Sequence, residues 1–127
     1  MTALPRRTAL EELGLRFETS VAEEHARCHP DDVEALRAVA YAYTAAGRLE
    51  EALAADLDLV RREPTRSDLQ YDLACSYALL HRKDEAFDAL VRSIELGFDD
   101  REHVEEDSDL DGLHADPRWA DLLKRLP

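Results

Sequence analysis

The segment from Asp107 to Gly112 has the arrangement of acidic residues that most directly suggests a metal site. Its sequence, Asp-Ser-Asp-Leu-Asp-Gly, matches the start of an EF-hand calcium loop, in which alternate residues supply oxygen ligands and the glycine allows a sharp turn. Such a loop closes with a bidentate glutamate six residues after the glycine, but this position is Arg118, a cation. Asp116 and Pro117 also predict that a helix begins before such a loop would be complete. We therefore interpret the segment as a polar turn and assign it no metal.

A second group of ligand-type side chains lies at His25, Cys28 and His29. Imidazole and thiolate are good ligands for zinc or copper, and residues three or four apart share a helix face. A structural zinc site needs four ligands, however, and no second pair stands nearby, because the other histidines are scattered. We interpret these residues as a helix end with a half-buried cysteine and two surface histidines, without a metal.

Catalytic motifs are missing from the sequence. The chain has only 4 glycines and contains no G-x-S-x-G, no P-loop and no G-x-G-x-x-G. Cys75 has Tyr71 one helical turn before it and Leu79 one turn after it, an apolar setting that disfavours the thiolate. We therefore predict that the protein is not an enzyme and uses no cofactor.

Composition and charge narrow the classes of partner. Of the 127 residues, 45% are hydrophobic and 35% are charged, which is typical of a single globular domain rather than a disordered or membrane protein. The net charge of −13 disfavours nucleic acid and anionic membrane surfaces and favours a neutral or basic partner. No apolar stretch follows Met1–Arg7, so we expect no signal peptide and a cytoplasmic location. Only 2 of the 16 basic residues, Lys83 and Lys124, are lysine, which suggests a GC-rich bacterial genome.

Two segments of the chain, residues 33–66 and 67–100, align with each other at an offset of 34. Each segment predicts two amphipathic helices, because its apolar residues recur at helical spacing. The expected apolar stripes are Leu36, Val39, Ala40 and Tyr43, then Ala52, Leu53, Leu57 and Val60, in the first segment, and Leu69, Leu73, Ala74 and Tyr77, then Ala86, Phe87, Leu90, Ser93 and Ile94, in the second.

Helix starts and stops are also indicated by particular residues. Asp31 and Glu34 have the spacing of a capping box before the first helix of the first segment, and Thr65 is the expected N-cap in the second. Gly47 predicts the turn within the first segment, and His81–Asp84 the turn within the second. Gly97 is expected to end the last repeat helix as a C′ glycine.

The repeat resembles the tetratricopeptide-repeat (TPR) family, whose 34-residue pattern is W-x₂-L-G-x₂-Y, then A-x₃-F, then P. The matching positions are Leu36, Val39, Ala40, Tyr43, Ala52, Asp56 and Pro64 in the first segment, and Gln70, Leu73, Ala74, Tyr77, Ala86, Leu90 and Phe98 in the second. The tryptophan is missing, Asp56 replaces an aromatic residue and Phe98 replaces proline. The small residues at these positions let paired helices approach closely.

The flanks of the repeats differ from this pattern. Residues 1–30, with Leu10, Leu13, Phe17, Val21 and Cys28, suggest one or two N-terminal capping helices that pack on the first repeat and bend at Gly14. Residues 101–127 suggest a C-terminal cap with a short acidic helix and a final helix that begins at Asp116-Pro117, and they are similar to the ends of some bacterial TPR proteins. The expected fold is thus all-α, an α-α superhelix with helical caps at both ends, in one domain over residues 1–127.

The resemblance implies a partner-binding groove, since in this family the first helix of each repeat lines a concave surface. By helical phase, the residues at this surface are Glu34, Arg37, Tyr41 and Thr44 in the first repeat and Asp68, Tyr71, Cys75 and Ala78 in the second. Some TPR domains hold a C-terminal carboxylate through lysine and asparagine at such positions. Here these positions hold Arg37 and Tyr41, with Asp72 in the next helix, so that a chaperone-tail partner is disfavoured.

The resemblance therefore favours a non-catalytic protein–protein interaction module, an adaptor, scaffold or assembly factor, that presents the groove to a neutral or basic peptide or protein. A self-associating structural module, such as a homodimer, is the first alternative, because two repeats are near the minimum for stability. A metal-responsive regulator is the second alternative.

Overall fold

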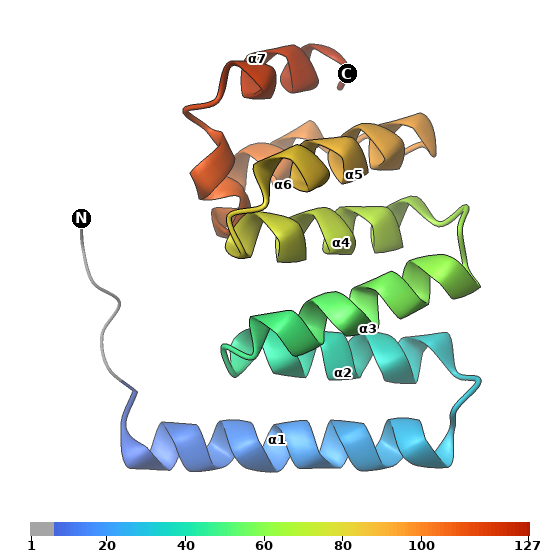
Figure 1. The fold of residues 1–127 in the computed structure, drawn as a ribbon, viewed down its shortest axis with the longest axis vertical. Helices are drawn as coiled ribbons and strands as arrows, with labels where there is room; N and C mark the ends of the chain where they lie inside the picture. Colours follow the sequence, from blue (N-terminus) through green and yellow to red (C-terminus); the bar gives the residue numbers. More distant parts are fainter. Residues whose placement is uncertain (1–6) are drawn as a thin grey trace.

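The computed structural model describes residues 7–127 of the chain. It consists of helices that stack one upon another, as Figure 1 shows. The expectations for residues 1–6, namely the missing signal peptide and the start of the N-terminal cap, lie outside the described residues. The elements are α1 (Ala9–Cys28), α2 (Val33–Ala45), α3 (Leu49–Arg62), α4 (Ser67–Leu79), α5 (Lys83–Glu95), α6 (Arg101–Glu106), the 3₁₀ helix η1 (Ser108–Leu113) and α7 (Pro117–Lys124).

Neighbouring helices in the sequence are also neighbours in space. α2 packs on α3, α4 packs on α5, and α3 joins the two hairpins by packing on α4. α1 lies against α2 at one end of the stack, and η1 and α7 lie against α4 and α5 at the other end (Figure 1). Residues 7–127 contain no strand, which confirms the prediction of an all-α protein.

Alanine residues are buried at equivalent positions of the two hairpins. The four alanines that recur at the offset of 34, at positions 40, 52, 74 and 86, are at most 2% exposed. A side chain of one methyl group lets two helix backbones approach where a leucine would hold them apart. Larger side chains fill the space on either side, with Leu59 and Leu69 between the hairpins and Leu90 inside the second.

The turns inside the two hairpins are structurally equivalent. Gly47 has φ +78° and His81 has φ +60°, and their positions differ by the same offset of 34. The left-handed backbone is easy for glycine and rare for histidine, so the second turn keeps the geometry of the first with a less suitable residue. Gly97, with φ +112°, follows α5 as expected for a helix-ending glycine.

Three local predictions are wrong. The N-cap of α2 is Asp32, whose carboxylate accepts from the backbone of Glu34, and not Asp31. α4 begins after Arg66, which makes no side-chain cap, so Thr65 is not its N-cap. Leu57 is 43% exposed, because Asp56 rather than Leu57 lies in the buried arc of α3.

The C-terminal segment packs against the second hairpin. Asp116 caps α7 by accepting from the backbone N–H of Arg118, with Pro117 at the first helical position, as predicted. Trp119 is buried, and Leu110 and Leu113 of η1 are at most 1% exposed, in the same core as Phe87 and Leu90. The last three elements therefore extend the core of α4 and α5 rather than form a separate unit.

The N-terminal helix packs in the opposite orientation to the predicted one. α1 is continuous through Gly14, and its side toward α2 holds Thr19, which is 2% exposed, and the partly buried Leu15, Ala22 and Ala26. The large residues expected to pack on the first repeat point away from it: Leu10 is 78%, Leu13 61%, Phe17 70% and Val21 53% exposed. The face with the smaller side chains packs on α2 because it allows the two helices to lie close together.

Within residues 7–127, no helix is both long enough and apolar enough to cross a lipid bilayer.

A matched pair of substitutions in α3 tests the close-packing argument. Ala52 is fully buried, whereas Ala54, on the same helix, is exposed. We expect Ala52→Leu to lower the free energy of unfolding by about 1–3 kcal/mol through overpacking. Ala54→Leu should change it by less than about 0.5 kcal/mol, because surface substitutions have small effects. Urea denaturation followed by circular dichroism measures both, and equal effects would contradict the assignment of the helix contact.

Candidate functional site

A cleft of about 350 Å³ lies between α2, α4 and the segment that joins α5 to η1. Its walls are both polar and aromatic, and its floor reaches the buried side of α3. The lining residues are Arg37, Ala40, Tyr41, Thr44, Asp56, Asp68, Tyr71, Asp72, Cys75, Ser76, Leu79, Phe98, His103, Asp107 and Asp109.

Six of the eight predicted groove residues line this cleft: Arg37, Tyr41, Thr44, Asp68, Tyr71 and Cys75. The other two lie elsewhere. Glu34 is exposed at the start of α2 and pairs with Arg66. Ala78 is 5% exposed and belongs to the core of the second hairpin. The structure thus brings most of the predicted set together around one space.

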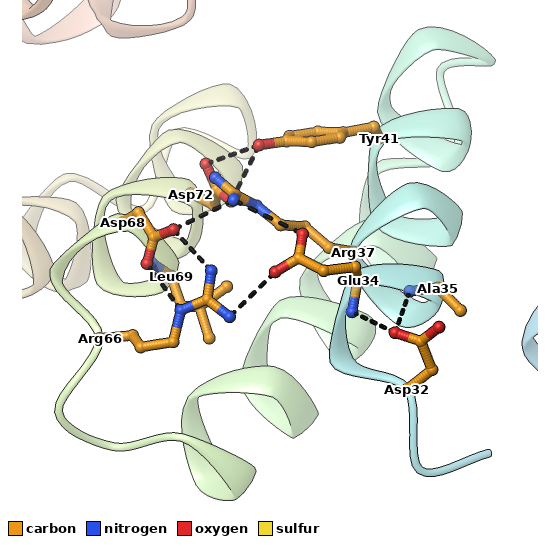
Figure 2. A network of polar contacts seen from close by, with 9 residues as sticks. All are labelled: Asp32, Glu34, Ala35, Arg37, Tyr41, Arg66, Asp68, Leu69 and Asp72. Carbon is orange, nitrogen blue, oxygen red and sulfur yellow. Dashed lines mark hydrogen bonds and ion pairs between the residues drawn. The ribbon is translucent and has the colours of Figure 1, made fainter. Parts of the chain in front are cut away.

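Arg37 joins α2 to α4 at one wall of the cleft, as Figure 2 shows. Its Nε donates to Asp72 at 2.8 Å and its Nη1 donates to Asp68 at 3.0 Å. Arg66 donates to the same Asp68 and also to Glu34, so the network of ion pairs leads back to α2. A guanidinium is suited to this role because its five donors lie in one plane and can reach two carboxylates at once.

Tyr41 adds a neutral donor to the same network. Its hydroxyl donates to Asp72 at 3.2 Å, while its ring remains 51% exposed at the edge of the cleft. Burial, with the neighbouring Asp72 charge, raises the pKa of Tyr41 to about 12, so the hydroxyl keeps its proton. Burial also raises the pKa of Asp72, against the opposing effect of Arg37.

Tyr71 and the C-terminal segment form the opposite wall. The Tyr71 ring stacks on Phe98 at a centroid distance of 4.5 Å and an interplanar angle of 3°. Its hydroxyl donates to Asp107 Oδ2 at 2.6 Å, and the Cys75 thiol donates to the same oxygen at 3.6 Å. His103 Nε2 lies 3.6 Å from this carboxylate. Asp107 therefore joins the C-terminal segment to α4 through the donors of Tyr71 and Cys75.

Asp109 differs from Asp107 because no donor from residues 7–127 bonds its carboxylate. Partial burial, together with the charges of Asp107 and Asp111, raises the pKa of Asp109. One ligand atom each from Cys75, Asp107 and Asp109 lies within 4.8 Å of the others. Burial raises the pKa of the Cys75 thiol, so this trio has a neutral thiol and two carboxylates.

Asp56 lies at the floor of the cleft and is only 4% exposed. Its carboxylate accepts a hydrogen bond from the Ser76 hydroxyl. Burial raises the pKa of Asp56 to about 6, and the bond from Ser76 only partly offsets this effect. A carboxylate at this position costs stability near neutral pH, because water no longer solvates the charge.

The other ligand-type side chains named from the sequence lie outside this cleft. The Cys28 thiol is exposed and bonds Glu24 at 3.6 Å, and the rings of His25 and His29 lie 4.5 Å apart at the end of α1. Within the described residues, the only trio of ligand-type atoms close enough to share a metal is the one at Cys75. The residues from Ser108 to Gly112 form most of η1 rather than an open loop.

Several lining residues were not predicted. Asp72 is equivalent to Ala38 at the repeat offset, so the offset gives no signal for its place in the cleft. Phe98, His103, Asp107 and Asp109 belong to a segment outside the repeat, so the offset does not place them. The burial of Asp56 could be inferred from the repeat offset, because the equivalent residue is the apolar Leu90.

Comparison of the chain with protein-family profiles, with curated proteins and with solved structures finds no match.

Asp56→Asn should reduce the pH dependence of stability. The folded protein holds the Asp56 proton more tightly than the unfolded chain does, since its pKa rises to about 6 from an ordinary 3.8. The stabilisation by the protonated form is fully present below pH 3.8 and is lost as the pH rises through 6. Relative to the variant, the wild type should lose on the order of 3 kcal/mol of unfolding free energy across this range. Urea titrations at several pH values measure this, with the exposed Asp88→Asn as the control, and a constant difference would contradict it.

Arg37→Ala tests the connection between α2 and α4. The substitution leaves Asp72 partly buried without its main donor, so we expect a loss of about 1–3 kcal/mol in unfolding free energy. Arg48→Ala removes an exposed pair with Glu51 at the start of α3 and should change stability much less, because solvent screens exposed ion pairs. A double-mutant cycle with Asp72→Asn isolates the pair, and a coupling energy near zero would show that the bridge does not stabilise the fold.

Proposed function

We propose that this chain is a TPR-like α-α superhelix, with helical caps at its ends, that binds a segment of another protein in the cleft and catalyses no reaction. The 34-residue offset, the buried alanines at equivalent positions and the equivalent turns at Gly47 and His81 support the repeat assignment. Because folds of this class support many functions, the functional proposal depends on the cleft itself.

The observation that supports binding most strongly is the excess of carboxylates in the cleft. Five aspartates face one arginine and one histidine along its lining: Asp56, Asp68, Asp72, Asp107 and Asp109 against Arg37 and His103. A concave site with one sign of charge and low-dielectric walls attracts groups of the opposite sign. A neutral or basic segment therefore fits this cleft better than an acidic one.

The two ends of the cleft differ in how well their charges are neutralised. At the end near Arg37, Asp68 and Asp72 already have ion-pair partners. At the end near Asp109, two carboxylates lie together beside the Tyr71–Phe98 stack. We assign the recognition of a lysine or arginine side chain to this second end, where a cation offsets the partial burial and the repulsion from Asp107 and Asp111 that raise the pKa of Asp109.

The remaining groups of the cleft support binding rather than catalysis. Burial raises the pKa of both Cys75 and Tyr71, so neither is a nucleophile near neutral pH. Hydrogen bonds hold Tyr71 and Asp107 in place before any partner arrives. Such a preformed wall lowers the entropy that is lost on binding.

Selection from a library of random short peptides tests this proposal. We expect the wild-type protein to select sequences rich in arginine and lysine and poor in glutamate and aspartate. Asp109→Lys reverses a charge in the cleft without breaking a hydrogen bond to this carboxylate, and it should weaken binding of a selected peptide at least about tenfold. Asp88→Lys makes the same change at an exposed position of α5, outside the cleft lining, and should leave binding unchanged. No selected motif, or the same affinity in both variants, would refute the proposal.

A further inference from the structure

The outer face of α1 is the most apolar exposed surface among the described residues. Four of the six large hydrophobic side chains that are exposed in residues 7–127 lie on it: Leu10, Leu13, Phe17 and Val21. They recur every three or four residues, so they form one stripe along the helix. The exposed Cys28 continues the same stripe at its end.

This stripe lies on the side of α1 opposite its contact with α2. The contact side holds Leu15, Thr19, Ala22 and Ala26, about half a turn around the helix from Phe17. α1 therefore has two apolar faces, as a helix does when it packs between two neighbours. A helix at the end of a stack needs a polar outer face to remain in water, and α1 lacks one along this stripe.

We propose that a second copy of this chain covers the stripe, with the two α1 helices antiparallel about a two-fold axis. The stripe is self-complementary in this arrangement. An axis level with position 19, midway between Leu10 and Cys28, places Leu10 opposite Cys28 of the second copy and Phe17 opposite its Val21. Each copy then gives and receives the same contacts, as a closed two-fold interface requires.

The shape of the helix surface agrees with this register. A shallow hollow of about 480 Å³ lies at the C-terminal half of α1 and is lined by Phe17, Ser20, Val21, Glu24, His25, Cys28 and His29. The protruding Leu10 and Leu13 are in the N-terminal half. Antiparallel pairing brings these leucines of one copy to the hollow of the other, twice by symmetry. Gly14 has open space around it and adds no side chain that would hold the helices apart.

The area and charge of the stripe are sufficient for a dimer of modest affinity. Its large apolar side chains expose on the order of 500 Å² per copy, so two copies bury about 1,000 Å², the lower limit of a specific interface. Glu24 lies within the stripe, between Val21 and Cys28, and Arg27 of the same helix offsets its charge. The cleft lies on other helices, so dimer formation and peptide binding are separate properties.

Sedimentation of the full chain from micromolar to millimolar concentration tests the proposal. We expect a monomer–dimer equilibrium in which Phe17→Ser weakens association at least about tenfold. Leu57→Ser removes an exposed leucine of α3, outside the stripe, and should leave association unchanged. Both positions are exposed, so the fold should be retained, which circular dichroism checks. A wild-type monomer at all concentrations, or equal association of wild type and Phe17→Ser, would overturn the proposal.

Disulfide cross-linking tests the direction of the two helices. In Leu10→Cys, oxidised glutathione should form a covalent dimer between the introduced thiol and Cys28 of the second copy, and Cys28→Ser in the same background should abolish it. The wild type should cross-link at least about tenfold more slowly, because antiparallel pairing holds the two Cys28 thiols at opposite ends of the interface. Equally fast cross-linking of the wild type would exclude the antiparallel arrangement.

Discussion

The close approach of helices at alanine positions is the constraint on which the rest of this structure depends. Ala40, Ala52, Ala74 and Ala86 are buried in the two hairpins, and α3 packs on α4, so the hairpins form one stack. Across this stack, Arg37 on α2 reaches both Asp68 and Asp72 on α4. The ion pairs then hold the two helices that form one wall of the cleft, while α3 joins the hairpins from behind.

How much could be predicted from the sequence differs between the repeat and its flanks. The 34-residue offset and the helical spacing predict the four central helices and their turns. The groove residues come from the family resemblance together with helical phase, and six of those eight line the cleft. The opposite wall could not be predicted, since Asp107 and Asp109 lie outside the repeat and only the folded chain brings them to Tyr71. The orientation of α1 was also missed. The large side chain of Phe17 predicted that this residue packs against α2. Both faces of α1 are apolar, however, and the face with the smaller side chains is the one that packs on α2.

Buried carboxylates make the cleft acidic and also lower the stability of the fold. Asp56 loses hydration at the floor, and Asp109 lies beside Asp107 with no donor among residues 7–127. A chain selected for stability alone would place apolar side chains at such positions, because isolated buried charge is unfavourable. Sites that keep such groups are often functional, and a basic partner would remove part of the repulsion between the two carboxylates. We therefore propose two separate binding surfaces, the cleft selecting by charge and the α1 stripe by apolar contact.

The most direct test of this account is an NMR titration of the isotope-labelled protein with a short arginine-containing peptide. Backbone and side-chain signals of Tyr71, Cys75 and Asp109 should shift in a saturable manner, with signals of α1 unchanged, because the peptide's cation is expected at the Asp109 end of the cleft. An otherwise identical peptide with glutamate in place of arginine should cause no such shifts. Shifts spread over the acidic surface without saturation, or confined to α1, would contradict the assignment of the cleft as the binding site.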